Sequence, residues 1–203
     1  LIARMSAQAD RAGVQRIRDT IRTAELDGPV KKLAGRTEAY LAKTVILASG
    51  ASPRPIGCKN EDAYVGRGIS FCATCDAAFF RDLEVFVAGG GNAAVEEALY
   101  LTSFARSVTL IYPSERLTAP KILQEQAAQN PKLRFLPHSV VEEVGGEGHD
   151  VLDRMVIRNV QTGQLTELRA DSRDGMFGLF GFLGFQPSTR LFEGQLDTEG
   201  GYL

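Results

Sequence analysis

Two cysteines three residues apart carry the clearest chemical signal in this sequence. Cys72 and Cys75 lie in the run Cys-Ala-Thr-Cys-Asp, in which Asp76 follows the second cysteine directly. Cysteines at this spacing can close a small disulfide at the start of a helix, where the helix dipole favours a thiolate. We therefore expect the pair to cycle between disulfide and dithiol. A buried Asp76 would exchange a proton with the thiolate that leaves or enters, whereas an exposed one would be an ordinary acid at a helix start.

A structural zinc site is the competing interpretation of a Cys-x-x-Cys pair. Such a site needs a second pair of ligands, and the two histidines, His138 and His149, lack a suitable spacing for one. We expect no metal in this protein. Cys58 has no cysteine near it in the sequence, so we interpret Cys58 and His138 as structural residues.

A glycine-rich turn gives the second signal. Gly89, Gly91 and Ala94 form a Gly-x-Gly-x-x-Ala pattern after the β-rich segment 84–88 and at the start of the helical segment 93–104. In this setting the glycines allow a tight turn and a close approach of the backbone to a pyrophosphate, and Ala94 lets helix and strand pack closely. The free N–H groups of the helix would face the phosphates. The alternative is a glycine-rich turn that binds no ligand.

The loop after the next strand bears on the choice between NADH and NADPH. At this place an acid binds the ribose 2′-hydroxyl of NADH, or arginines bind the 2′-phosphate of NADPH. The loop reads Tyr112, Pro113, Ser114, Glu115 and Arg116. One arginine beside a glutamate is a poor phosphate clamp. The composition of the loop favours a solvated Glu115, and a Glu115 that accepts from the ribose of NADH is the next interpretation.

A βαβ unit positions the glycine turn. The segments 84–88 and 108–111 are β-rich and flank the helical segment 93–104, so we expect two parallel strands. Downstream, the pattern predicts a helix over 119–129 and strands at 133–136, 140–144, 154–160, 165–169 and 176–185.

The N-terminal segment predicts a separate, smaller set of elements. Residues 1–12 have helical spacing, and three β-rich segments that predict an antiparallel meander follow at 14–21, 30–33 and 38–41. Residues 44–48 predict a buried strand. Breakers around Pro53 and Pro187 mark two crossings between domains.

The composition excludes several functional classes. The chain has 203 residues with a hydrophobic fraction of 44%, and its 23 basic and 25 acidic residues give a net charge of -2. Without a run of like charge, we expect no nucleic-acid and no membrane-surface partner. No apolar run reaches the roughly 18 residues that span a bilayer, and no signal peptide is visible. Three cysteines are too few for a secreted disulfide scaffold, so we expect a cytoplasmic protein.

Residues 72–81 and 89–100 resemble the bacterial low-molecular-weight thioredoxin reductases. The similarity continues in the segments 47–51, 184–189 and 192–194. The resemblance implies an α/β fold of two FAD- and NAD(P)-binding Rossmann-like domains with three β/β/α layers, in which the flavin domain is incomplete. Three parts of the chain would then be residues 1–53 as part of the FAD-binding domain, residues 54–185 as the NAD(P)-binding domain with the redox-active pair, and residues 186–203 as the return into the truncated FAD-binding domain.

The resemblance also implies an activity. Electrons would pass from NADPH or NADH through FAD to the cysteine pair, and on to thioredoxin or a similar protein disulfide, in a homodimer when the protein is full length. Cys75 would face the flavin, Cys72 would attack the partner disulfide, and Asp76 matches the acid–base residue. The implied cofactor contacts are Ala48, Ser49 and Gly50 near the flavin, Gly89, Gly91, Asn92, Ala93 and Ala94 at the pyrophosphate, and Gly184 near the nicotinamide.

Three departures from the family pattern qualify these expectations. The arginines that clamp the 2′-phosphate in the family are absent, since their positions hold Pro113, Ser114 and Thr118, and Tyr112 stands at the position of the family's histidine. The donor is therefore open between NADPH, NADH and another source such as ferredoxin. Ala77 stands where most relatives have glycine. The two flavin-binding glycine segments of the family are missing, so we expect this chain to hold FAD weakly by itself.

Two other functions compete with a thioredoxin reductase. The first is a non-catalytic nucleotide-binding relative that keeps the fold, which the altered clamp favours and the intact cysteine motif disfavours. The second is the flavoprotein subunit of a peroxide-reducing system, whose partner would be a disulfide-carrying domain other than free thioredoxin.

Overall fold

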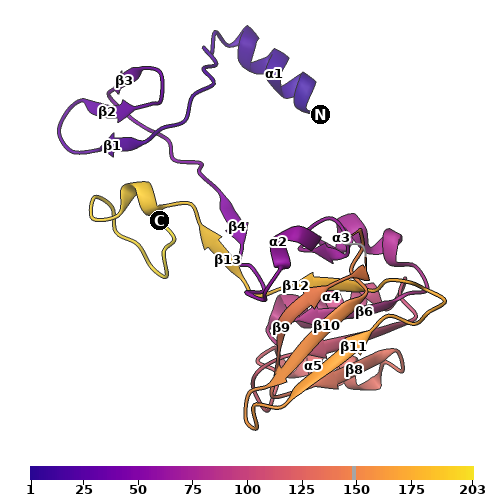
Figure 1. Ribbon diagram of the computed structural model, residues 1–203. Helices are drawn as coiled ribbons and strands as arrows, with labels where there is room; N and C mark the ends of the chain where they lie inside the picture. The colour runs from indigo at the N-terminus through magenta and orange to yellow at the C-terminus, as the bar shows by residue number, and fades with distance from the viewer. Residues whose placement is uncertain (148–149) are drawn as a thin grey trace. The chain divides into compact units, whose positions relative to one another are not determined.

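The computed structural model describes residues 1–147 and 150–203, so His149 lies outside the described residues. The chain divides into two compact units (Figure 1). Unit 1 consists of Leu1–Ala51 and Pro187–Leu203, and unit 2 consists of Ser52–Gln186. The assignment of a cofactor to each part of the chain stays a prediction.

A parallel five-stranded sheet forms the centre of unit 2. Its order is β5-β12-β6-β7-β8, and every neighbouring pair runs parallel. The strands are β5 (Ile69–Ser70), β12 (Gly178–Gly181), β6 (Glu84–Ala88), β7 (Ser107–Ile111) and β8 (Leu133–Leu136). Helix α4 (Asn92–Leu101) connects β6 to β7, which confirms the predicted βαβ unit. Strand β6 is buried along nearly its whole length because a parallel sheet is covered on both faces.

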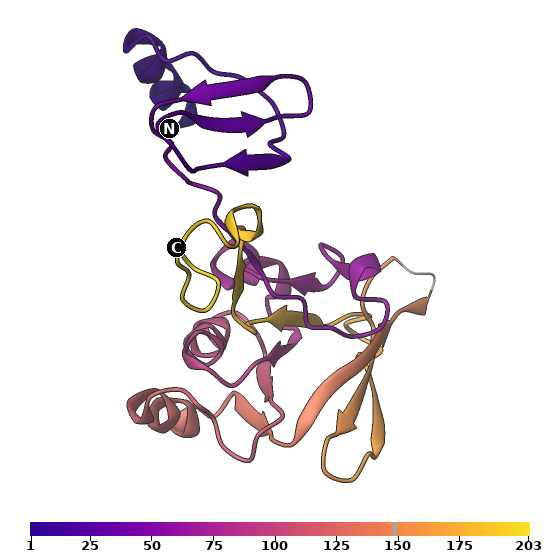
Figure 2. The same ribbon diagram turned by 90° about the vertical axis from the view of Figure 1, so that its left-hand side faces the viewer.

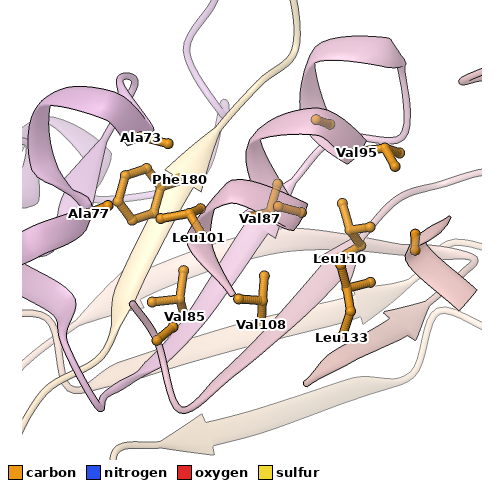
Figure 3. Close-up of a cluster of buried hydrophobic side chains, with 14 of the residues drawn as sticks. Ala73, Ala77, Val85, Val87, Val95, Leu101, Val108, Leu110, Leu133 and Phe180 are labelled. Carbon is orange, nitrogen blue, oxygen red and sulfur yellow. The ribbon is translucent and has the colours of Figure 1, made fainter. Parts of the chain in front are cut away.

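Helices cover one face of this sheet. Val87, Val108 and Leu110 of the strands belong to one buried cluster with Val95 and Leu101 of α4, and Figure 3 shows these helix side chains over the strand residues. Helix α5 (Lys121–Gln129) contributes the buried Ala127 to the same cluster. Because successive side chains of a strand point to opposite faces, the alternate residues of β6 are free to build a second core on the other face.

An antiparallel meander covers that other face. It consists of β9 (Ser139–Gly145), β10 (Arg154–Asn159) and β11 (Leu165–Arg169), in the order β11-β10-β9. Phe86 and Leu179 of the sheet lie in one buried cluster with Val141, Val144 and Met155 of the meander. Figure 2 shows the helices on one side of the sheet and the meander on the other. These three layers confirm the predicted β/β/α arrangement.

Short elements and a two-stranded sheet complete unit 2. Helix α2 (Glu61–Tyr64) precedes β5, and α3 (Ala73–Asp76) and the 3-10 helix η1 (Ala77–Phe80) follow it. The chain crosses between the units through β4 (Ala51–Pro53) and β13 (Phe185–Pro187), which pair with each other. None of the helices that the structure describes is long and apolar enough to cross a membrane.

Unit 1 confirms the predicted helix and meander and corrects two predicted strands. It contains α1 (Ile2–Arg11), an antiparallel sheet of β1 (Thr23–Glu25), β2 (Lys31–Ala34) and β3 (Ala39–Ala42), and the 3-10 helix η3 (Arg190–Phe192). The prediction of a strand at 14–21 is wrong, since the first strand begins at Thr23. The prediction of a buried strand at 44–48 is also wrong, because these residues are exposed or half-buried and no described strand pairs with them.

Candidate active site

The predicted cysteine pair is present as a disulfide. Cys72 and Cys75 are joined through their sulfur atoms, and their Cα atoms lie 5.3 Å apart. Cys72 comes just before α3 in extended conformation, and Cys75 lies within that helix. Cys72 is half-buried and Cys75 is exposed. The disulfide is therefore within reach of a partner from solution.

The helical turn that carries the disulfide is fixed to the core of unit 2. Ala73 and Ala77 are both buried in the cluster on the helix-covered face. Phe80 packs edge-on against Phe180 of β12, with 5.2 Å between the ring centroids. Gly178 makes room for this ring, because a Cβ atom there would lie 2.7 Å from Phe80 Cδ1. The cysteines thus sit on a rigid element although they themselves reach the surface.

The backbone and surroundings of Ala77 show why alanine fits where most relatives have glycine. Its backbone has ordinary helical angles, φ -52° and ψ -35°, which any L-residue adopts. The methyl group is buried with its neighbours. Glycine is therefore not required at this position, and its replacement by alanine is compatible with the fold.

Asp76 is held by a serine that sequence analysis did not single out. Ser70, at the end of β5, donates a hydrogen bond from Oγ to Asp76 Oδ2 at 2.6 Å, and its Oγ accepts the Cys72 backbone N–H at 3.1 Å. Asp76 is half-buried, so the structure lies between the two predicted environments. A serine two residues before a cysteine is too common a pattern to identify such a contact in advance.

A cavity of about 460 Å³ opens beside Ser70 and Asp76. Phe79, Phe80 and Met176 contribute apolar walls to it. Phe79 is 78% exposed, which is unusual for a large aromatic side chain. The redox pair is thus accompanied by an accessible apolar surface.

The glycine turn has the geometry of a dinucleotide-binding loop. Gly89 has φ +144°, and a Cβ atom there would lie 2.5 Å from the Phe182 carbonyl oxygen and 2.9 Å from Ala94 Cβ. Only glycine fits this position. Ala94 is completely buried beneath the turn. Gly91 caps α4 in extended conformation, so the first N–H groups of the helix point out of the turn.

A second cavity of about 460 Å³ lies over this helix start. Five of the predicted cofactor residues line it, namely Gly89, Gly91, Asn92, Ala93 and Gly184. A Cβ atom at Gly91 would meet only Thr118 Oγ1 within 4 Å, at 3.9 Å, so the space above the helix start is open. The first turn of α4, which the structure describes in full, holds no acidic side chain. The residues present therefore fit the pyrophosphate of a dinucleotide.

One wall of this cavity over the glycine turn consists of neutral side chains. Tyr112, Pro113, Ser114 and Thr118 line it. Tyr112 is buried, and burial raises the pKa of its phenol. Thr118 donates from its N–H to the Gly90 carbonyl at 2.8 Å, which ties this wall to the glycine turn.

Glu115 and Arg116 are exposed and are not among the residues that line the cavity over the glycine turn. Ser114 Oγ donates to the Arg116 carbonyl at 2.7 Å, which closes a short turn around Glu115. The exposure of Glu115 agrees with the favoured interpretation of a solvated side chain.

The residues assigned to flavin belong to unit 1. Ala48, Ser49 and Gly50 are exposed in a segment without strand pairing. Gly50 has φ +72°, and its carbonyl accepts the Ser188 N–H at 2.9 Å. The role of these three residues at a flavin stays a prediction.

The surroundings of Cys58 and His138 agree with a structural role for both residues. Cys58 is buried, and burial raises the pKa of its thiol to about 12. His138 has φ +53° and donates its N–H to the Ser114 carbonyl at 3.2 Å. Across residues 1–147 and 150–203, no group of three His, Cys, Asp or Glu residues is placed to hold a metal ion.

The fold and the two sites define a class of protein in which an α/β unit carries a glycine turn at a helix start together with a Cys-x-x-Cys disulfide. The chain belongs to the pyridine nucleotide-disulphide oxidoreductase family, whose model matches residues 5–203. It is 46% identical over 204 residues to the thioredoxin reductase of Peptoclostridium acidaminophilum and also 46% identical to that of Peptoclostridium litorale. The alignments cover this whole chain and 64% of each relative.

Solved structures give the same assignment. The crystal structure of Lactococcus lactis thioredoxin reductase in its FR conformation matches with a TM-score of 0.78 and 34% identity. That match covers 98% of this chain and 63% of the other. The chain thus spans less than two thirds of the length of these relatives.

Proposed function

We propose that this chain provides the disulfide-reducing and dinucleotide-binding parts of a thioredoxin-reductase-like flavoprotein. The observation that carries the proposal is the pairing, within unit 2, of an accessible Cys72–Cys75 disulfide with an open cavity at the glycine turn. One site exchanges electrons with a protein disulfide, and the other binds the source of those electrons. Relatives named thioredoxin reductases support this combination.

The cysteines would act by thiol–disulfide exchange. The Cys72 thiolate attacks a disulfide of the partner, and this bond breaks to release one partner thiolate. The Cys75 thiolate then attacks Cys72 in the mixed disulfide, which closes the Cys72–Cys75 bond and releases the second partner thiolate. Two electrons pass to the partner, and Asp76 takes or returns the proton at the cysteine pair.

Regeneration of the dithiol requires an electron pair and two protons. A reduced nicotinamide dinucleotide at the cavity of Gly89 and Gly91 is the source that we propose. FAD, which the family resemblance implies, would carry this electron pair to the disulfide. The steps that we assign to this chain's own residues are dinucleotide binding and disulfide exchange.

NADH is the dinucleotide that the cavity favours. The 2′-phosphate of NADPH is normally held by arginine, whereas the 2′-hydroxyl of NADH needs only neutral or acidic partners. Pro113, Ser114 and Thr118 form a neutral wall, and each missing charge-assisted hydrogen bond would cost about 1.5–3 kcal/mol of NADPH binding.

Thioredoxin or a similar small protein disulfide is the partner that we propose. The exposed Phe79 offers apolar surface beside the redox pair, which suits a protein more than a small polar disulfide. The complete protein would act as a homodimer in the cytoplasm, where partner disulfides need continuous reduction.

Transfer of electrons from the reduced chain to thioredoxin tests this function without any cofactor. The chain is reduced with dithiothreitol, desalted without oxygen and mixed with oxidised thioredoxin, and free thiols on each protein are counted by alkylation and mass spectrometry. We expect close to one thioredoxin disulfide reduced per chain, no reduction by Cys72→Ser, and full reduction by the control Cys58→Ala. Thioredoxin that stays oxidised, while Cys72 and Cys75 still react with a small disulfide, would overturn the proposal in favour of a nucleotide-binding relative without turnover.

A further inference from the structure

We propose that Ser70 is a positioning residue, which holds the Asp76 carboxylate at the cysteine pair and assigns its two oxygens different tasks. The inference rests on the proposed exchange chemistry of Cys72 and Cys75. It adds a residue from the sheet to that chemistry and predicts a specific pH dependence.

The hydroxyl of Ser70 forms hydrogen bonds with both Asp76 and Cys72. It has one proton to donate, and the nearer acceptor is Asp76 Oδ2 at 2.6 Å, since the Cys72 carbonyl lies at 3.4 Å. The lone pairs of the same Oγ accept the Cys72 N–H at 3.1 Å. Ser70 is 6% exposed, so water competes little for these bonds.

The contact closes a ring of hydrogen bonds on a rigid base. The Asp76 N–H donates to the Cys72 carbonyl at 3.2 Å, so Ser70, Cys72 and Asp76 are each bonded to the other two. Ser70 itself is placed by strand pairing, opposite Phe180 in the parallel ladder of β5 and β12. The position of the Asp76 carboxylate therefore depends on the central sheet as well as on the surface turn that carries Asp76.

This geometry fixes the orientation of the Asp76 carboxylate. The hydrogen bond from Ser70 holds Oδ2 on the side of β5. With Oδ2 occupied by Ser70, Oδ1 is the oxygen for exchange with sulfur. A thiol proton of the cysteine pair moves to Asp76, leaving a thiolate for attack, and Asp76 gives this proton to the first thiolate that the partner releases. The proton of the second cysteine goes to the second thiolate released, so two protons leave the pair together with the two electrons.

The test is the pH dependence of exchange between the reduced chain and Ellman's reagent, from pH 5 to pH 9, by stopped flow. This small disulfide requires neither thioredoxin nor a dinucleotide, so the result is independent of whether the proposed partner and donor are right. We expect Ser70→Ala to slow exchange about tenfold near pH 6 and to move the midpoint of the rising limb to higher pH. Ser70→Thr, which keeps the hydroxyl, should restore the midpoint.

Two controls separate positioning from a general structural role. Ser139 is also a buried serine, and its Oγ donates to the Pro137 carbonyl at 2.9 Å, so Ser139→Ala should leave the pH profile unchanged. In an Asp76→Asn background, Ser70→Ala should have no further effect, because the residue acts through the carboxylate. An equal slowing by Ser70→Ala at all pH values, or a full effect in the Asp76→Asn background, would overturn the proposal.

Discussion

The cysteine site and the glycine turn of unit 2 obtain their geometry by opposite means. At the cysteine site, side chains fix the reacting groups, since Phe80 anchors the turn in the core and Ser70 holds Asp76. At the glycine turn, the missing side chain of Gly89 lets the backbone approach Phe182 and Ala94 closely. A site built from side chains can lose its chemistry while the fold persists, whereas a site built from close backbone packing is lost together with local stability.

Phe80→Ala should produce the largest effect, a loss of stability, because Phe80 anchors the turn of the cysteine site in the core. It removes a buried ring that packs against Phe180, and such truncations cost about 3–5 kcal/mol of unfolding free energy. Thermal and urea unfolding measure this loss. The neighbouring Phe79 is 78% exposed, so Phe79→Ala should change stability by less than about 0.5 kcal/mol. Equal losses in the two variants would contradict the anchoring role of Phe80.

Gly89→Ala should damage the fold and dinucleotide binding together. The new methyl group would collide with the Phe182 carbonyl at a backbone angle that alanine avoids, and we expect a loss of about 2–4 kcal/mol in stability. Gly163 also has a positive φ but has open space around it, so Gly163→Ala should cost only about 1 kcal/mol. Unfolding and calorimetric binding of NADH measure both consequences. A Gly89→Ala chain that binds NADH normally would contradict the proposed loop.

Two added arginines should change which dinucleotide binds without affecting the cysteines. The double variant Ser114→Arg with Thr118→Arg places cations on the neutral wall of the cavity over the glycine turn. We expect its affinity for NADPH to rise at least about tenfold relative to NADH, as measured by calorimetry at one salt concentration. The unchanged chain should prefer NADH. Preferential binding of NADPH by the unchanged chain would show that other residues take the place of arginine there.

An ion pair at the N-terminal end of β7, away from the glycine turn that follows β6, should affect stability alone. Its effect should be the smallest of those that we predict. Arg106 precedes β7, and its Nη1 donates to Asp174 Oδ1 at 3.2 Å, which holds the pKa of Asp174 below its ordinary value. A lowered carboxyl pKa contributes stability that is present above the ordinary pKa and lost as the pH falls below about 4. Arg106→Gln should therefore lose less stability between pH 7 and pH 3 than the unchanged chain. Unfolding midpoints at the two pH values measure the difference, and an equal loss in both chains would exclude this contribution.

The sequence predicted those parts of the fold and site that depend on local patterns. The βαβ unit, the glycine turn over Gly89 and Gly91, and the Cys72–Cys75 pair were all readable within short segments. The prediction of a strand at 44–48 failed because a strand depends on a partner that the local pattern does not contain. Ser70 was missed for a similar reason, since its role arises only when β5 brings it against Asp76.

Trapping of a mixed disulfide with thioredoxin tests the central claim most directly. In Cys75→Ser, the remaining Cys72 thiolate can attack a partner disulfide, but no second cysteine can resolve the adduct. The account predicts that reduced Cys75→Ser accumulates a covalent adduct with oxidised thioredoxin, visible by non-reducing electrophoresis and mass spectrometry, and that Cys72→Ser forms little. If neither variant forms an adduct, although both react with Ellman's reagent, the cysteine pair does not serve a protein disulfide of this kind.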